Sequence, residues 1–507
     1  MRRSGVIEGF WLPEAVRGHV LSADTRWESL SFVDGRECGC ECEAGAPGAV
    51  TARWPQLSAE AWTRMLDHLT AARRTAPRGP EFWDRLQAAL LSAAKRLSDP
   101  GDPLHVAAVD AIPRYTGYSA AMIASTLGAP EMWDMRQMAH ALALDPTKAA
   151  AVRWQPLPGL SGRLRFFPGG ARPVVRQWWS RGGPFARLPG RLPLYSRQPL
   201  FGDAEAPGFV TGFGAGNVPG TALIMALLAL STTLAGDAPP VVVVRNSRRE
   251  PIFGPLVLAA LEKADADLVG TTAILTWDYD DAELQDRLLS RSDLVIAAAG
   301  DDTIGRIAGR IAADRTAAGH GSSDQAQPRF HPHGHKVSFS AIGREMLVQR
   351  RQTAPSLGEG ELLAVVTLLA GLDSIFWDQN GCLSSRIHFV ETGGHSDFSA
   401  QAYAEQLAEQ LRRLSHILPR GAWPLRQLHD TFDRYKALEG IERLGSGLRV
   451  LSDYDDEFVV VLDERPPDKP RFDPRIFGAL VNDCQGRVVM VRPLDDLMEL
   501  PRRYLSL

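Results

Sequence analysis

Residues Gly208–Leu230 have the sequence GFVTGFGAGNVPGTALIMALLAL, in which a glycine-rich turn joins two apolar stretches. The first stretch, Gly208–Phe213, predicts a short buried strand, and the second predicts a buried helix over 222–234. Glycines in the turn let the backbone approach a ligand, and the helix N-terminus that follows favours an anion. The spacing is not a full G-x-G-x-x-G, so an ordinary glycine turn is the alternative. The unusual element is Asn217, a polar amide fixed shortly before the rigid Pro219.

The alternation of strand and helix that begins in this stretch continues to about residue 299. Continuous apolar strands that alternate with helices are typical of a parallel, doubly wound α/β sheet. We therefore predict one α/β domain over 206–350 and a second over 351–507, which opens with a long apolar helix past Glu359. The predicted elements are Val241–Arg245, Gly254–Lys263, a strand within Leu268–Trp277, Ala282–Leu289, Leu294–Ala299, Ser399–Ile417, Glu457–Leu462 and Arg487–Val491.

The N-terminal region, 1–155, predicts a mostly helical structure after a short β-like opening. Apolar residues recur at three- and four-residue spacing, and Ser58 and Ser119 stand where helix caps belong. The resulting helices cover 59–71, 81–97 and 118–144.

A connecting arm rich in Arg, Pro and Gly follows over 156–205. Its central part, 157–198, contains eight arginines and no acidic residue. One interpretation is an arm strapped over the protein surface. The other is a docking strip for phosphates or for an acidic carrier protein.

The composition excludes several classes of protein. A chain of 507 residues has room for two to four domains, and its 45% apolar content excludes wholesale disorder. The 56 basic and 60 acidic residues give a net charge of −4, which argues against nucleic acid as a partner. Five cysteines are too few for a disulfide framework and favour a reducing compartment. The longest apolar run, Thr221–Leu230, is too short to span a membrane, so we expect a cytoplasmic protein.

A second motif, Asp378-Gln379-Asn380-Gly381-Cys382, places a cysteine at a tight glycine turn with apolar sequence on both sides. Such a turn presents a sulfur atom to a cleft, and nearby N–H groups can stabilise a thiolate or an oxyanion. An inert buried cysteine is the alternative, and the motif by itself leaves both open.

The remaining cysteines and a histidine cluster give weaker signals. Cys38, Cys40 and Cys42 are too closely spaced for an ordinary zinc site and suggest the edge of a β-hairpin, while Cys484 suggests a hairpin turn. His331, His333 and His335 alternate, but no acidic or cysteine partner is near them in sequence. We therefore predict no metal site and expect these histidines in a loop near the active cleft.

The two motifs occur together, and in this order, in the aldehyde dehydrogenase superfamily. Over about 205–500 the chain resembles the fatty-acid (acyl-CoA/acyl-protein) reductase branch of that superfamily, the LuxC type. The motifs that carry the resemblance are Gly216–Gly220, similar to the Asn-x-Pro oxyanion element; Val241–Arg245, similar to the strand that ends in a cofactor-binding Lys; Gly300–Arg306, similar to a Gly-Ser-x-x-x-Gly turn; and Asp378–Cys382, similar to the stretch around the catalytic cysteine.

The resemblance implies a fold and a set of site residues. The fold is α/β and aldehyde-dehydrogenase-like, with a doubly wound, Rossmann-like NADP(H)-binding domain over 206–350 and a catalytic domain over 351–507. Cys382 would be the nucleophile, and the Asn217 amide would bind the oxyanion. The residues that would bind the cofactor are Gly216, Arg245, Ser247, Arg248, Gly300, Asp301, Thr303 and Gly305.

Three departures from the family pattern bear on the expected cofactor and reaction. Arg245 replaces the Lys, which keeps the charge but changes its geometry. Arg248 stands where NAD-preferring relatives often have a Glu, and an arginine would attract a 2′-phosphate, so we expect NADPH rather than NADH. The stretch 332–336 lacks the Glu that activates water in hydrolytic aldehyde dehydrogenases.

The resemblance thus implies NADPH-dependent reduction of an acyl thioester to an aldehyde through an acyl-cysteine. The substrate would be an acyl-CoA or an acyl-carrier protein, possible partners are an acyl-transferring enzyme and further copies of the chain, and reductase relatives generally continue beyond the position of Leu507. One alternative is a hydrolytic or CoA-acylating aldehyde dehydrogenase that works in the oxidative direction. A second alternative is a non-catalytic scaffold with this fold.

Overall fold

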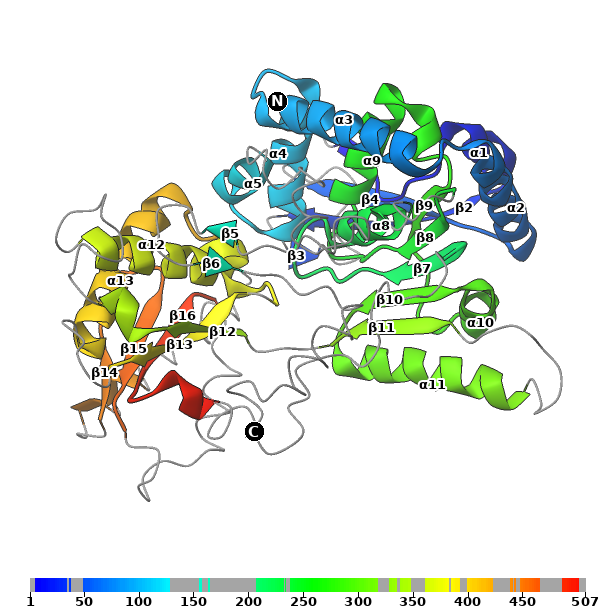
Figure 1. The fold of residues 1–507 in the computed structure, drawn as a ribbon. Helices are drawn as coiled ribbons and strands as arrows, with labels where there is room; N and C mark the ends of the chain where they lie inside the picture. Colours follow the sequence, from blue (N-terminus) through cyan, green and yellow to red (C-terminus); the bar gives the residue numbers. More distant parts are fainter. Residues whose placement is uncertain are drawn as a thin grey trace.

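The structure is a computed structural model that describes most of the chain. The described part is built around three parallel or mixed sheets (Figure 1). The described residues are 5–33, 36–37, 49–127, 155–156, 163–164, 207–231, 233, 238–317, 328–334, 338–347, 361–382, 384–392, 399–422, 438–440, 442–443, 447–465 and 486–500.

One five-stranded sheet has the order β11-β10-β7-β8-β9, and all its strands are parallel. Along the chain this order corresponds to 5-4-1-2-3, so the sheet is doubly wound, as predicted, and its order reverses between β7 and β10. The reversal point leaves a crevice at the carboxyl ends of these strands, where such sheets bind ligands. The strands are β7 (Phe209–Phe213), β8 (Val241–Arg245), β9 (Thr272–Leu275), β10 (Leu294–Ala298) and β11 (Arg329–His333).

The helices of this lobe follow the predicted pattern with small changes at their ends. Four valines and Arg245 make up β8, whose bounds agree with the prediction, and every residue of β7, β8 and β9 is buried. The glycine turn after β7 leads into an apolar helix, as predicted. The helices are α8 (Thr221–Ser231), α9 (Phe253–Ala264), α10 (Ala282–Arg291) and α11 (Asp301–Ala317), with the 3₁₀ turn η4 (Ala266–Leu268) after α9.

A second five-stranded sheet forms the other lobe, with the order β12-β13-β16-β15-β14. Four of its strands are parallel, and β14 pairs antiparallel with β15 at one edge. The strands are β12 (Ser338–Ile342), β13 (Ser385–Glu391), β14 (Leu448–Val450), β15 (Val459–Asp463) and β16 (Val488–Leu494). The helices are α12 (Glu361–Ile375) and α13 (Ala400–Ile417), with the 3₁₀ turns η5 (Arg344–Leu347), η6 (Phe376–Gln379) and η7 (Leu497–Glu499).

The apolar helix α12 belongs to the interior of this lobe. By length and composition, Leu362–Gln379 is the one stretch in the described residues that could cross a membrane. More than half of it, 56%, is buried inside the structure, and α12 packs against α13. A core helix of a folded domain has the same properties, so this stretch is weak evidence for a membrane span.

The N-terminal region is mostly helical, as predicted, and it also contains a four-stranded sheet that is larger than the expected β-like opening. Ser58 and Ser119 cap α2 and α5, as predicted, but α4 was not predicted. The elements are β1 (Gly5–Glu8), α1 (Glu14–Val20), β2 (Arg26–Val33), β3 (Arg36–Glu37), β4 (Val50–Gln56), α2 (Ala59–Thr75), α3 (Gly79–Ser98), α4 (Pro103–Thr116) and α5 (Ala120–Leu127).

The N-terminal region packs directly on the doubly wound lobe. Trp11 exchanges two backbone hydrogen bonds with Ile274 of β9, at 2.7 and 3.0 Å. Arg85 of α3 makes a forked ion pair with Asp265, which follows α9. One hydrophobic core therefore runs through the N-terminal region and both lobes.

Some expectations concern residues that are described only in part or not at all. Of the arm 156–205, a short antiparallel pair is described, β5 (Gln155–Pro156) with β6 (Arg163–Leu164). Most of the arginine strip, Cys38, Cys40, Cys42, Cys484, His335 and the predicted helix beyond Leu127 lie outside the described residues. His331 and His333 lie on β11 rather than in the expected loop, because their segment pairs with β10.

Candidate active site

The turn after β7 and the turn before β13 meet, although they lie far apart in the sequence. The Asn217 side chain donates a hydrogen bond from Nδ2 to the backbone carbonyl of Asn380, at 2.6 Å. A Cβ added at Gly381 would come within 3.7 Å of Val218 Cγ2. Cys382, the next residue, is exposed and has no disulfide partner. The turns that contain Asn217 and Cys382, the two residues predicted to carry the chemistry, are therefore in contact.

The hydrogen bond to Asn380 orients the Asn217 amide and leaves one of its N–H donors available. A side-chain NH₂ group has two hydrogens, and the bond to Asn380 uses one of them. The other can point toward an oxygen of a molecule bound at Cys382. Asn217 is itself exposed, so such a molecule can reach it. The arrangement supplies one oriented donor beside a free thiol, which is what a developing oxyanion requires.

A buried carboxylate holds the turn that carries Asn217. Glu250, 4% exposed, accepts hydrogen bonds from the backbone N–H groups of Gly220, Ile252 and Phe253 at 2.8–3.0 Å. Burial raises the pKa of this carboxyl, and the three N–H donors act in the opposite direction. Gly220 has φ +83°, and a Cβ there would lie 2.8 Å from the Phe253 ring, so only glycine fits.

The turn that carries Cys382 has an unusual backbone. Trp377, Asp378 and Gln379 have consecutive positive φ angles of 55°, 48° and 64°. Residues with side chains rarely adopt this left-handed conformation, and surrounding structure must hold them there. Immediately afterwards, Asn380 N–H donates to the Trp377 carbonyl at 2.8 Å, and Ser384 N–H donates to the Gly381 carbonyl at 3.0 Å.

Two residues that sequence reasoning missed also contact this site. The Tyr118 hydroxyl donates to the Asn217 carbonyl, and its ring lies edge-on to Trp377, with centroids 5.2 Å apart. Burial, and then the negative charge of Asp378, raise the pKa of Tyr118, so the phenol stays protonated as a donor. Ser338, the first residue of β12, donates to the Cys382 carbonyl. Gly117 ends α4, and this glycine could have indicated from the sequence that Tyr118 begins a turn. The sequence around Ser338 contains no comparable signal.

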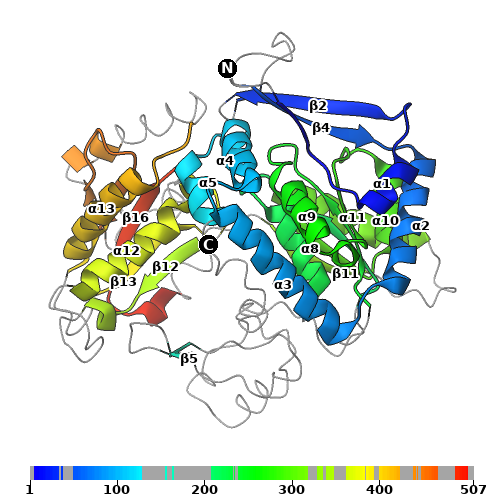
Figure 2. The same ribbon diagram turned by 90° about the horizontal axis from the view of Figure 1, so that it is seen from above.

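The N-terminal helices bring Tyr118 to this junction. Seen from above, α4 and α5 lie between the two lobes, and α5 lies next to α12 (Figure 2). The backbone N–H of Trp377 also contacts Met122 Sδ of α5, at 3.1 Å. The N-terminal region therefore forms part of the wall behind the cysteine turn.

Gly216 fits tightly against the segment that follows β8. A Cβ at Gly216 would lie 2.0 Å from Ser247 Oγ and 2.9 Å from the Arg249 Cβ, a distance that real side chains do not tolerate. The Ser247 hydroxyl in turn accepts the backbone N–H of Arg249 at 3.1 Å. Gly216 and Ser247 thus pack directly against each other, next to Asn217 in the sequence.

The arginine that ends β8 and the two that follow the strand have different surroundings. Arg245 is buried: its Nε donates to the Trp277 carbonyl at 2.8 Å, and its guanidinium stacks 3.6 Å from the Tyr279 ring centroid. Burial lowers the pKa of Arg245, and the nearby tyrosine partly offsets this. Arg248 pairs with two carboxylates, Glu28 of β2 at 2.9 Å and Asp278 at 2.7 Å.

Arg249 differs from both neighbours. It is exposed, and in the described part of the chain its side chain makes no ion pair. Its side chain is therefore accessible to an anion from the solvent.

The remaining predicted cofactor residues lie at the start of α11, directly after β10. Gly300, Asp301, Thr303 and Gly305 occupy its first turns, and a Cβ at Gly300 or Gly305 would meet nothing within 4 Å. A helix N-terminus at the reversal point of a doubly wound sheet suits a diphosphate. The Asp301 carboxylate lies close to Gly334, where a Cβ would be 2.4 Å away.

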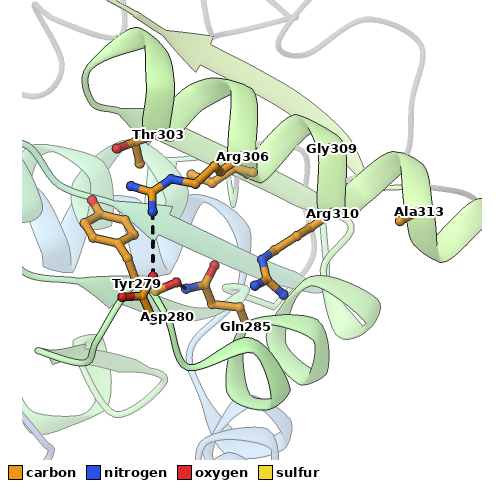
Figure 3. A pocket seen from close by; sticks show the side chains of 9 residues that line it. Tyr279, Asp280, Gln285, Thr303, Arg306, Gly309, Arg310 and Ala313 are labelled. Atoms are coloured by element: carbon orange, nitrogen blue, oxygen red, sulfur yellow. Dashed lines mark hydrogen bonds and ion pairs between the residues drawn. The ribbon is translucent and has the colours of Figure 1, made fainter.

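A cavity of about 280 Å³ lies beside this helix, between α10 and α11 (Figure 3). The aromatic ring of Tyr279 and the side chain of Arg306 face it, and Arg306 approaches Asp280 at 3.7 Å. Flat apolar and cationic surfaces of this kind suit the face of an aromatic ring system. The lining residues are Tyr279, Asp280, Gln285, Thr303, Arg306, Ile307, Gly309, Arg310 and Ala313.

The family model of the LuxC acyl-CoA reductases matches residues 193–506, which is more than half of the chain. The chain belongs to the LuxC acyl-CoA reductase family. The match covers both motifs and extends somewhat beyond the 205–500 expected from them. No curated protein sequence matches the chain.

Solved structures show that this LuxC-family chain has the aldehyde dehydrogenase fold. It is similar to the Δ-pyrroline-5-carboxylate dehydrogenase from Mycobacterium tuberculosis, with a TM-score of 0.51 and 14% identity over 95% of this chain and 72% of that one. It is also similar to aldehyde dehydrogenase 21 from Physcomitrella patens, with a TM-score of 0.51 and 13% identity over 95% of this chain and 80% of that one. At these identities the likeness establishes the fold.

Among the described residues, no group of three or more His, Cys, Asp or Glu side chains could hold a metal ion. The segment where hydrolytic relatives have a Glu contains His333 at the exposed end of β11 and no carboxylate. Membership of the LuxC family supports an oxidoreductase that acts on acyl or aldehyde carbon, and the free thiol and the oriented amide lie on turns that are in contact.

Proposed function

We propose that this protein reduces acyl thioesters to aldehydes with NADPH, through an acyl-enzyme on Cys382. The observation that carries the proposal is the contact of the Asn217 amide with the cysteine turn, at 2.6 Å from the Asn380 carbonyl. Membership of the acyl-CoA reductase family supports the thioester as substrate. The protein would work in the cytoplasm on acyl-CoA or an acyl-carrier protein, with a homo-oligomer and an acyl-transferring enzyme as possible assemblies.

The residues of the chain account for formation of the acyl-enzyme. The Cys382 thiolate attacks the thioester carbonyl carbon, and the electron pair of the C=O bond moves to the oxygen. The second hydrogen of Asn217 Nδ2, together with the Cys382 backbone N–H, stabilises that oxyanion. As the oxyanion collapses, the bond to the departing sulfur breaks, that sulfur leaves as a thiolate that takes a proton from water, and the acyl group remains on Cys382.

The residues around the crevice fit a nicotinamide dinucleotide. The open N-terminus of α11 at Gly300 suits the diphosphate, and the cavity beside Tyr279 suits an aromatic base. When bound, NADPH would supply the hydride that reduces the acyl carbon. The same oxyanion donors would hold the oxygen again in the hemithioacetal, and its collapse would release the aldehyde and restore the thiolate.

The charge after β8 supports NADPH over NADH. Arg248 and Arg249 stand where a 2′-phosphate would approach, and Arg249 is exposed. Arg248 is shared with Glu28 and Asp278, so a phosphate would replace one of two carboxylates rather than meet a free cation. The comparison that tests this preference is kcat/KM with NADPH against NADH at fixed acyl-CoA.

The decisive experiment for the reaction follows NADPH oxidation and aldehyde formation with acyl-CoA in the wild type and in Cys382→Ala. Cys484→Ala serves as a control for the loss of a thiol elsewhere in the chain. Equal rates in wild type and Cys382→Ala would refute the assignment of the nucleophile. Carboxylate formation from an aldehyde with NADP⁺ and no thiol acceptor would favour a hydrolytic dehydrogenase instead, and failure of Cys382 to take an acyl label would favour a scaffold.

A further inference from the structure

The three left-handed residues before Cys382 are held by buried side chains from distant parts of the chain. Asp378 and Arg487 are both fully buried, and their side chains form an ion pair with an N···O distance of 2.8 Å. The partners lie 109 residues apart in sequence. Arg487 stands just before β16 and itself has φ 70°, so each side of this pair comes from a backbone that is rarely populated by non-glycine residues.

Hydrogen bonds of this pair join the cysteine turn to neighbouring segments, and Arg487 also approaches the Glu457 carboxylate at 3.6 Å. Asp378 Oδ2 accepts the backbone N–H of Gly421 at 3.1 Å. The Arg487 guanidinium donates to the Leu418 carbonyl at 2.7 Å and to Ser415 Oγ at 3.3 Å. The pair therefore anchors the turn to the end of α13 and to the chain that follows it.

Gln379 secures the next position of the turn. Its Oε1 accepts the backbone N–H of Val488 at 2.9 Å, and its Nε2 donates to the Val488 carbonyl at 2.7 Å and to the Ser385 carbonyl at 3.0 Å. At the start of β13 and β16, the Gln379 side chain thus makes the backbone hydrogen bonds that a neighbouring strand would otherwise make. The direction in which the chain leaves Gln379 toward Cys382 is thus fixed.

We propose that Asp378 and Arg487 are positioning residues, which hold the strained turn so that Cys382 faces the Asn217 amide. The proposal rests on Cys382 being the reactive nucleophile of the proposed function. A fixed backbone matters here because an error of about 1 Å between nucleophile and oxyanion donor costs about 10²-fold in rate. Without the pair, Trp377, Asp378 and Gln379 would relax toward ordinary φ angles, and the chain direction at Cys382 would change.

The chain offers a matched control for the loss of a buried ion pair. Asp463, at the end of β15, is fully buried and pairs with Arg492 of β16 at 2.8 Å. Its described contacts, with Arg492 and Arg465, do not include the cysteine turn. Asp463→Asn should therefore lower stability without moving Cys382.

The experiment compares Asp378→Asn, Asp463→Asn and the double variant Asp378→Asn/Arg487→Met. Two readouts are taken: the rate of iodoacetamide alkylation at Cys382, followed by peptide mass spectrometry across pH, and kcat and KM for acyl-CoA reduction. The double variant removes both members of the ion pair, so it should recover much of the stability lost in the single variant.

We expect Asp378→Asn and the double variant to lose about 10²-fold in kcat, with an altered alkylation rate and little change in KM. Asp463→Asn should keep both the alkylation rate and kcat of the wild type. Recovery of kcat together with stability in the double variant, or an unchanged alkylation rate in Asp378→Asn, would overturn the positioning role. If the wild type reduces no acyl thioester while Asp378→Asn still changes the alkylation of Cys382, the proposed function fails and the positioning role stands.

Discussion

The amide of Asn217 and the backbone carbonyl of Asn380 are 2.6 Å apart, and this hydrogen bond links the turn after β7 to the turn that carries Cys382. Because the acceptor is a backbone atom, the link depends on the side chain of Asn217 alone. Any change at Asn217 therefore removes the proposed oxyanion donor and the link at once, whereas a change at Asn380 need remove neither.

Asn217→Ala should lower kcat for acyl-CoA reduction by about 10²–10³, because one oxyanion donor is lost. The free energy of unfolding should change little, since Asn217 is exposed. Asn380→Ala is the control, because it keeps the carbonyl, and it should retain most of the activity. Steady-state kinetics and thermal unfolding of both variants check the prediction, which is wrong if the two lose activity equally.

Tyr118→Phe should lower kcat by roughly 5-fold, since a neutral hydrogen bond contributes about 1 kcal/mol. The lost hydroxyl is the one that donates to the Asn217 carbonyl. Tyr115→Phe removes a comparable hydroxyl, which donates to the Arg248 carbonyl, and should leave kcat unchanged. Equal effects of the two substitutions on kcat would show that Tyr118 does not act through Asn217.

Asp278→Asn should favour NADPH, because it removes one carboxylate that competes with a 2′-phosphate for Arg248. We expect KM for NADPH to fall by roughly 10-fold, in line with about 1.5 kcal/mol for a hydrogen bond to a charged group, while KM for NADH stays constant. Glu283→Gln removes the same charge from an exposed position on α10 that does not line the cavity beside Tyr279, and it should change neither constant. A parallel fall in both KM values would assign the effect to general electrostatics.

Glu391 should make stability sensitive to acid. Its carboxylate accepts two hydrogen bonds from Arg344, and these lower its pKa to about 2 from the ordinary 4.5. Because the folded pKa is the lower one, the stabilisation is fully present above pH 4.5 and is lost as the pH falls toward 2. Glu391→Gln should flatten the dependence of the unfolding free energy on pH in this window. Urea unfolding at several pH values checks the prediction, and an unchanged slope would contradict it.

The sequence predicted those parts of the site that lie next to one another along the chain. Val241–Arg245 has the predicted bounds because its run of branched residues is bordered by Pro240 and by polar residues. Asn217 and Cys382 were paired through the family resemblance, and the hydrogen bond from Asn217 to Asn380 shows that their two turns are in contact. The helix α4 could have been predicted, since Asp102 caps it, Pro103 begins it and Gly117 ends it with φ 84°.

The supporting residues could not be predicted, because their roles depend on tertiary contacts. Nothing around Arg487 in the sequence indicates that it pairs with Asp378 or that its φ is positive. The sequence shows the charges of Arg245 and Arg248 but does not indicate their surroundings. Arg245 is buried against the Tyr279 ring, and Arg248 pairs with Glu28 of the N-terminal sheet.

The position of Tyr118 has a consequence for the construction of chimeras. The family match begins at residue 193, so a swap designed on that boundary would leave the first 192 residues to a different parent. Those residues include the phenol that touches the Asn217 backbone and the carboxylate of Glu28 that holds Arg248. In such a hybrid, Cys382 would come from one parent protein, while Tyr118 and Glu28 would be replaced by residues of the other. If those residues did not remake the two contacts, turnover would fall even where both parts of the hybrid fold.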